Sequence, residues 1–155
     1  MISYDRDRRR NSDAYNSTIT RCVENALGVA YLRESNTQED FRGIDHWFVG
    51  NIYDLDLDFD PTADQHSVQY KVQHTRSFHT WTVQTNQWPY PVNFYAFAHV
   101  GTRRVYIVDG DTLKSMVPVS LYNGPNSNQP FFYGQLSDLV DAGAIVCDFN
   151  GEVVQ

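Results

Sequence analysis

The sequence predicts a single α+β domain of the three-layer α/β/α kind, with a central mixed sheet, an N-terminal helix and short C-terminal helices. A stripe of apolar residues at helical spacing comes first, and several short apolar runs with strand character follow it. Short capped segments then separate the last strands, an order typical of α+β architecture. At 155 residues, with 41% hydrophobic and 14% aromatic residues, the chain has enough apolar material for one well-packed core.

The N-terminal helix is expected over residues 13–32, because apolar residues recur there every three or four positions. Ser12 or Asp13 is a suitable N-cap. The predicted buried stripe consists of Tyr15, Ile19, Cys22, Val23, Ala26, Leu27 and Ala30. Glu24 lies at the edge of this stripe. Its carboxylate either reaches over the rim of the sheet or faces solvent as an ordinary helix glutamate.

The strands are expected from short runs rich in β-branched and aromatic residues. Residues 35–43 are predicted as a loop that leads into a strand at 44–50. Residues 52–60 alternate between apolar residues and aspartates, which indicates a half-buried strand with an acidic outer face. The remaining predicted strands are 67–73, 78–84, 94–100, 105–108 and 144–149, and the predicted short helices are 111–117 and 136–142.

Residues 1–11 are interpreted as a flexible charged arm, and residues 12–155 as one domain. The first ten residues lack the apolar segment of a secretory signal, and no apolar run approaches the roughly 20 residues of a membrane span. Cys22 and Cys147 have apolar neighbours and no metal-ligand spacing, so both are expected to be buried free thiols. We therefore expect a cytoplasmic protein.

Acidic residues are concentrated in one part of the chain. The net charge is −7, and residues 34–64 hold nine acidic residues against one arginine, which leaves a charge of +1 for the rest. Such a cluster either holds divalent cations or forms a solvated acidic face.

One carboxylate, one amide and one amine fall on two neighbouring strand-like runs within or beside this acidic segment. Asp45 enters the run at 44–50, while Gln69 and Lys71 lie in the run at 67–73. Because side chains alternate along a strand, Gln69 and Lys71 point to the same face. If the two runs pair as a hairpin, all three polar groups meet on that face. The alternative is a polar sheet face without an active site.

These residues resemble the motif of the PD-(D/E)xK nuclease superfamily, which includes restriction endonucleases, phage endonucleases and Holliday-junction resolvases. The matching pieces are a helix bearing an acid, Glu24, then Gly43-Ile44-Asp45 entering a strand, and Gln69-Tyr70-Lys71 in a second strand. The family usually has a carboxylate at the position of Gln69, although some members carry glutamine. The resemblance implies a restriction-endonuclease-like fold.

The resemblance also implies a magnesium- or manganese-dependent endonuclease acting on DNA. Asp45 and Gln69 would then be metal ligands, Glu24 an additional acid for which Asp40 competes, and Lys71 the group that orients or deprotonates water. A homodimer is plausible, because cutting two strands is simplest with two sites. Compact nucleases of this kind are frequent in phages.

Further residues are candidates for contacts with phosphates or bases, with ordinary surface positions as the alternative: Gln73, His74, Arg76, His79, Arg103 and Arg104. The five histidines form no zinc motif. The competing functional interpretation is a non-catalytic protein, either a degenerate nuclease fold or an acidic DNA mimic that binds a protein partner. The acidic segment motivates it, because DNA-binding surfaces are usually positive.

Overall fold

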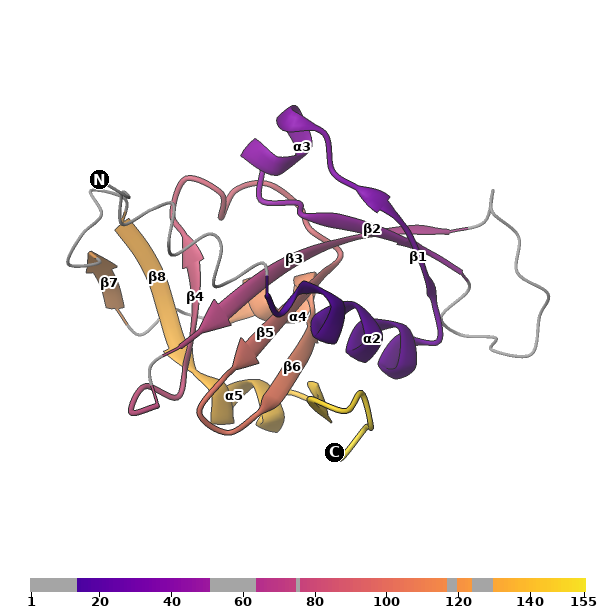
Figure 1. Cartoon of the computed structure of the whole chain (residues 1–155). Helices are drawn as coiled ribbons and strands as arrows, with labels where there is room; N and C mark the ends of the chain where they lie inside the picture. The colour runs from indigo at the N-terminus through magenta and orange to yellow at the C-terminus, as the bar shows by residue number, and fades with distance from the viewer. Residues whose placement is uncertain (1–13, 51–63, 75, 117–119, 124–129) are drawn as a thin grey trace, which may run out of the picture.

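A six-stranded mixed sheet lies at the centre of the fold (Figure 1). The computed structural model describes residues 14–50, 64–74, 76–116, 120–123 and 130–155. The strand order is β1-β2-β3-β5-β6-β9, and every neighbouring pair is antiparallel except the parallel pair β3 and β5. The strands are β1 (Ala30–Glu34), β2 (His46–Val49), β3 (Gln65–Gln73), β5 (Phe94–His99), β6 (Arg104–Asp109) and β9 (Ile145–Asp148).

A second, smaller antiparallel sheet has the order β4-β8-β7. Its strands are β4 (Thr80–Gln84), β8 (Pro130–Gln135) and β7 (Ser120–Asn123). Since β4 lies in the connection between β3 and β5, this sheet is attached to the central one through the crossover. Neither β7 nor β8 was predicted from the sequence.

Helix α2 (Asn16–Leu27) covers one face of the central sheet (Figure 1). Ile19, Cys22, Val23 and Leu27 are buried there, as their spacing predicts. The predicted helix over 13–32 was too long at its C-terminal end, because Gly28 adopts a left-handed conformation (φ 68°) that ends the helix. Residues 30–32 belong to β1 instead. The predicted caps Ser12 and Asp13 lie outside the described residues.

The opposite face of the sheet is covered by α4 (Gly110–Ser115), α5 (Leu136–Asp141) and the smaller sheet. Its core includes Trp81, Tyr95, Phe97, Leu113 and Leu139. The domain is therefore mixed α+β with a central mixed sheet, as predicted, but the third layer combines two short helices with strands.

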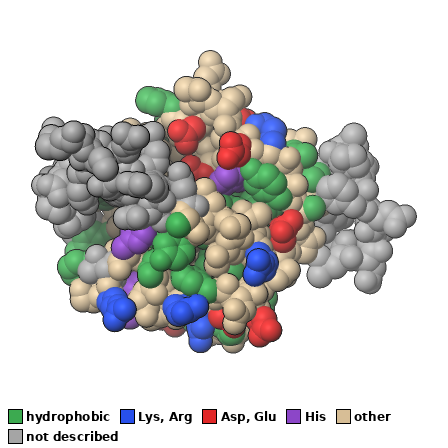
Figure 2. Space-filling view, in the orientation of Figure 1, with side chains coloured by type: hydrophobic (Ala, Val, Ile, Leu, Met, Phe, Trp, Pro, Cys, Tyr) green, Lys and Arg blue, Asp and Glu red, His purple; other side chains and the backbone are tan. Residues whose placement is uncertain are grey.

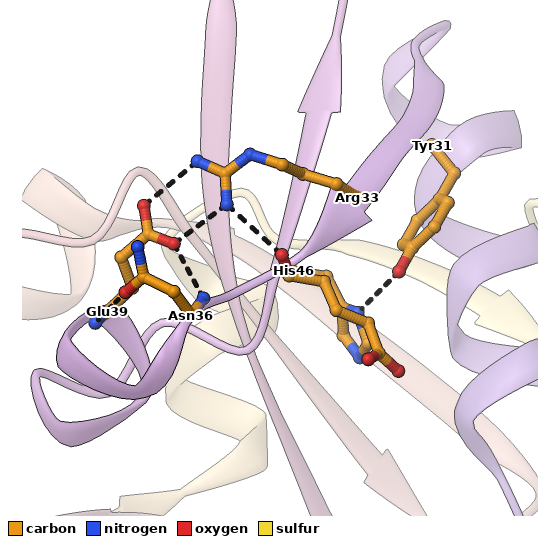
Figure 3. Close-up of polar contacts among 6 residues, drawn as sticks. Tyr31, Arg33, Asn36, Glu39 and His46 are labelled. Carbon is orange, nitrogen blue, oxygen red and sulfur yellow. Dashed lines mark hydrogen bonds and ion pairs between the residues drawn. The ribbon is translucent and has the colours of Figure 1, made fainter.

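Residues 35–43 were wrongly predicted as a loop, because α3 (Thr37–Phe41) lies within them. The Asn36 side chain accepts a hydrogen bond from Glu39 N, and the Glu39 carboxylate accepts one from Asn36 N. This reciprocal capping box stabilises the start of a helix. Arg33 of β1 also donates two hydrogen bonds to the Glu39 carboxylate, at 2.8 and 3.0 Å (Figure 3). The Asn-x-x-Glu spacing was the sequence signal for this helix.

The other elements are found where the sequence predicts them, with ends that differ by a few residues. The predicted strand at 52–60 lies outside the described residues. In the part of the chain that the structure describes, no helix is long and apolar enough to cross a membrane.

Candidate functional site

The pairing of β2 with β3 brings the predicted polar residues together. The two strands are antiparallel with His46 opposite Val68, and Asp45 N donates a hydrogen bond to Val68 O (3.0 Å). Asp45, one position before His46, therefore lies beside Gln69, one position after Val68. The hairpin-like pairing that the sequence argument required is confirmed.

The side chains of β3 alternate between the two faces as predicted. Val68 is fully buried in the core beneath α2, and Tyr70 packs against the same core. On the other face, Gln69 Nε2 donates a hydrogen bond to Gln87 Oε1 (2.8 Å), and Lys71 Nζ lies 4.8 Å from the centroid of the Phe131 ring. Gln69 and Lys71 thus face the connection between β4 and β5 and the strand β8.

Asp45 is partly buried, and its carboxylate accepts a hydrogen bond from Tyr70 N (2.7 Å). Burial raises the pKa of Asp45 to about 7, because it penalises the charged form. The hydrogen bond from Tyr70 and the charge of Lys71 lower this pKa, whereas the Asp40 carboxylate raises it. Near neutral pH, Asp45 is therefore close to the midpoint of its titration.

The structure brings Asp40, and not Glu24, to Asp45. Asp40 is an exposed residue of α3, and its carboxylate is close enough to influence the titration of Asp45. The Glu24 carboxylate instead accepts a hydrogen bond from Tyr31 N (3.1 Å) on the side of the sheet that α2 covers. Of the two acids that the sequence left open, Asp40 lies at the site.

Gln69 contributes an unusual buried oxygen. The residue is only 6% exposed, and its Oε1 atom has no hydrogen-bond partner among the described residues. A buried carbonyl oxygen without a partner costs about 1–3 kcal/mol. Oxygen atoms of carboxylates and amides are the ligands that Mg²⁺ prefers, so Oε1 has the chemistry of an unused cation ligand.

The donor set for a cation combines this amide oxygen with two carboxylates, those of Asp45 and Asp40. Among the described residues, no group of three or more histidines, cysteines or acidic residues is arranged to hold a metal ion. A divalent cation here would therefore depend on the Gln69 carbonyl as its third protein ligand. The residues fit a weakly held Mg²⁺ or Mn²⁺, because a neutral carbonyl binds less strongly than a carboxylate.

Gly43 makes room for the Gln69 amide. Its φ of +94° lies in the region that favours glycine, and a Cβ atom there would lie 2.8 Å from Gln69 Nε2. Two further residues of the site, Gln87 and Phe131, were not foreseen. Both come from distant parts of the chain, and no local pattern marks either of them.

The remaining titratable candidates have structural surroundings. Cys22 and Cys147 are buried free thiols, as predicted, and burial raises the pKa of Cys22 to about 12, which opposes a role as a nucleophile. His46 lies on the α2 side, where its Nδ1 is hydrogen-bonded to the Tyr31 hydroxyl (3.0 Å, Figure 3). His99 is fully buried beside Thr102.

Comparisons of the chain with protein-family models, curated proteins and solved structures give no significant match. The nuclease superfamily suggested by the motif therefore stays a prediction. The function has to be argued from the site itself.

Replacement of Gly43 by alanine should disturb the Gln69 amide specifically. Gly143 provides a matched control, because its φ is +96° but a Cβ atom there would meet nothing within 4 Å. Both substitutions should lower the free energy of unfolding by about 1 kcal/mol because of the backbone conformation. Gly43→Ala should lower it by about 1–2 kcal/mol more, as measured by urea unfolding. The NMR resonances of the Gln69 side-chain amide should shift in Gly43→Ala but not in Gly143→Ala. Equal losses of stability in the two variants would contradict the close contact between Gly43 and the Gln69 amide.

Asp45→Asn should stabilise the metal-free protein at alkaline pH. Because the pKa of Asp45 is higher in the folded than in the unfolded chain, its contribution to stability is lost as the pH rises from about 4 through about 7. Asparagine still offers an oxygen to Tyr70 N but carries no charge. We expect Asp45→Asn to be more stable than the wild type by about 2 kcal/mol at pH 8.5 in EDTA, with the difference shrinking towards pH 4. A variant less stable than the wild type at pH 8.5 would refute this account.

Proposed function

We propose that the protein is a metal-dependent endonuclease that hydrolyses phosphodiester bonds in DNA. The observation that carries this proposal is the placement of Asp45 beside Gln69 and Lys71, with Asp40 and Lys71 close enough to affect the pKa of Asp45, and with a buried carbonyl oxygen on Gln69 that has no hydrogen-bond partner among the described residues. A buried carbonyl oxygen without a hydrogen bond lowers the stability of the fold. A role as a cation ligand would explain why such an oxygen is retained.

A bound Mg²⁺ or Mn²⁺ would supply an activated water and charge stabilisation at the phosphoryl oxygens. Asp45 and Gln69 are the residues that would hold it, with Asp40 as the additional acid. Asp45 must be deprotonated for this task, and its pKa of about 7 makes that state well populated only from neutral pH upwards.

Lys71 lies on the same face as Gln69 and is close enough to Asp45 to lower its pKa. The ammonium group rests over the Phe131 ring at 4.8 Å, a cation–π contact that restricts the side chain. From this position Lys71 orients the attacking water or holds the scissile phosphate as a point charge.

A basic surface at the C-terminal end of β3 supports DNA as the substrate. It consists of Arg76, Arg103 and Arg104, and we call it the arginine surface. The turn after β5 packs against the turn after β3, since Val100 N donates to Gln73 O (3.0 Å) and a Cβ atom at Gly101 would lie 2.9 Å from Arg76 Cα.

The two predicted groups of basic residues therefore meet at one end of the sheet. Figure 2 shows Lys and Arg side chains along the lower edge of the molecule, where these turns lie. None of the three arginines forms an ion pair with a residue in the described part of the chain. Unpaired cations in an acidic protein are suited to bind phosphates.

Cleavage of supercoiled, linear and four-way-junction DNA tests the proposal. We expect Mg²⁺- or Mn²⁺-dependent nicking that Asp45→Asn and Lys71→Met each reduce by about a thousand-fold or more, since several kcal/mol of charge stabilisation are removed. Asp111→Asn, which removes an exposed acid in the first turn of α4, should cleave like the wild type. No cleavage on any substrate, together with no metal binding by calorimetry, would favour the non-catalytic alternative.

Gln69→Glu should strengthen metal binding. The substitution turns a neutral ligand into a charged one, and Gln87 can turn its amide to donate a hydrogen bond to the new carboxylate. We expect the Mg²⁺ concentration for half-maximal cleavage to fall by about ten-fold. Gln65→Glu adds the same charge to β3 at its exposed first residue, four positions before Gln69, and should leave that concentration unchanged. An equal effect of both variants would show a general charge effect and not a ligand at position 69.

A further inference from the structure

The candidate site lies beside the end of α3, since Gly43 N donates a hydrogen bond to Asp40 O (3.0 Å) and Gly43 borders the Gln69 amide. Gln69 is 6% exposed and is closed off by its hydrogen bond to Gln87, whereas Asp40 in α3 is exposed. The residues at the end of α3 are Asp40, Phe41 and Arg42, and all three are exposed.

Phe41 presents a large apolar ring to solvent at the end of α3. Its exposed fraction is 67%, the highest among the exposed large hydrophobic residues of the described part of the chain. It follows Asp40 directly and precedes the Gly43-Ile44-Asp45 segment. A phenylalanine stabilises a fold mainly when its ring is buried, so a ring left in water here contributes little to stability.

The helix that carries Phe41 is held firmly in place. The capping box of Asn36 and Glu39 fixes its start, and two hydrogen bonds from Arg33 tie Glu39 to β1 (Figure 3). At its end, Gly43 N donates to Asp40 O (3.0 Å) and Ile44 N donates to Glu39 O (3.0 Å). The ring therefore projects from a fixed support.

A cation follows Phe41 directly in the chain. The exposed Arg42 guanidinium lies 5.8 Å from the centroid of the Tyr90 ring, a cation–π contact that restricts its orientation. Arg42 is the one base in the acidic segment of residues 34–64. An exposed aromatic ring and a cation on consecutive residues are groups of the kind that bind single-stranded nucleic acid, through base stacking and phosphate contact.

We propose that Phe41 stacks on an unpaired nucleobase next to the scissile phosphate, so that the preferred substrate is DNA with single-stranded or unpaired nucleotides at the cut. This inference rests on the proposed nuclease function. In an intact duplex both faces of a base are covered by its neighbours, and a ring finds a free face only where stacking is interrupted. Arg42 holds a flanking phosphate.

The test is a binding measurement that needs no cleavage. Oligonucleotides with 2-aminopurine in a single strand, in a bulge or in a fully paired duplex are titrated with full-length protein in EDTA. Stacking on Phe41 should change the 2-aminopurine fluorescence in the first two oligonucleotides. Phe41→Ala should abolish this change and weaken binding about ten-fold, and Phe41→Trp should retain both.

Phe78→Ala is the matched control, because Phe78 is a second exposed phenylalanine (57%) in the turn between β3 and β4. It should behave like the wild type. Since both rings are exposed, thermal unfolding should be unchanged in all variants. Loss of the signal in Phe78→Ala but not in Phe41→Ala would overturn the proposal, as would equal binding of paired and unpaired DNA by the wild type. Stacking on Phe41 without any metal-dependent cleavage would refute the nuclease function alone, and cleavage insensitive to Phe41 would refute the stacking alone.

Discussion

The hydrogen bond between the Asp45 carboxylate and Tyr70 N joins the architecture of the sheet to the chemistry of the site. The β2–β3 ladder ends at Asp45 N, which donates to Val68 O, and the Asp45 side chain then binds the backbone N–H two residues further along β3. The same hydrogen bond therefore gives Tyr70 N an acceptor and fixes the orientation of the Asp45 carboxylate, a candidate metal ligand. Because β3 also pairs with β5, this carboxylate is fixed to the interior of the sheet and not to a loose edge.

The site combines several features that stability alone would not favour. A carboxylate whose pKa is raised to about 7 and a buried carbonyl oxygen without a partner both cost folding free energy. Glycine at position 43, with φ +94°, allows the Gln69 amide to approach. Proteins commonly give up some stability at the residues that carry out their function, and the proposed metal site is an interpretation of these features on that basis.

Much of the fold could be predicted from local patterns, because alternation and helical spacing act over short distances. The pairing of the strand after Asp45 with the strand of Gln69 was considered from the sequence, but the register that places Asp45 beside Gln69 came only from the structure. The end of α2 was misplaced because the left-handed Gly28 was not weighed against helical spacing, and α3 was missed although Asn36 and Glu39 formed a capping signal. Gln87 and Phe131 could not be foreseen, because their places at the site depend on the crossover and the second sheet. The choice of Asp40 over Glu24 likewise needed the tertiary arrangement.

The dependence of the site on β8 has a consequence for biosynthesis. Asp45, Gln69 and Lys71 have all been synthesised once the chain reaches Gln73, but the ring beneath Lys71 belongs to Phe131 of β8. β8 in turn pairs with β4, which lies in the crossover between β3 and β5. A ribosome-bound chain that stops before residue 130 therefore carries the polar residues without the strand that supports Lys71. Lys71 therefore lacks its aromatic contact until β8 has been synthesised and has paired with β4.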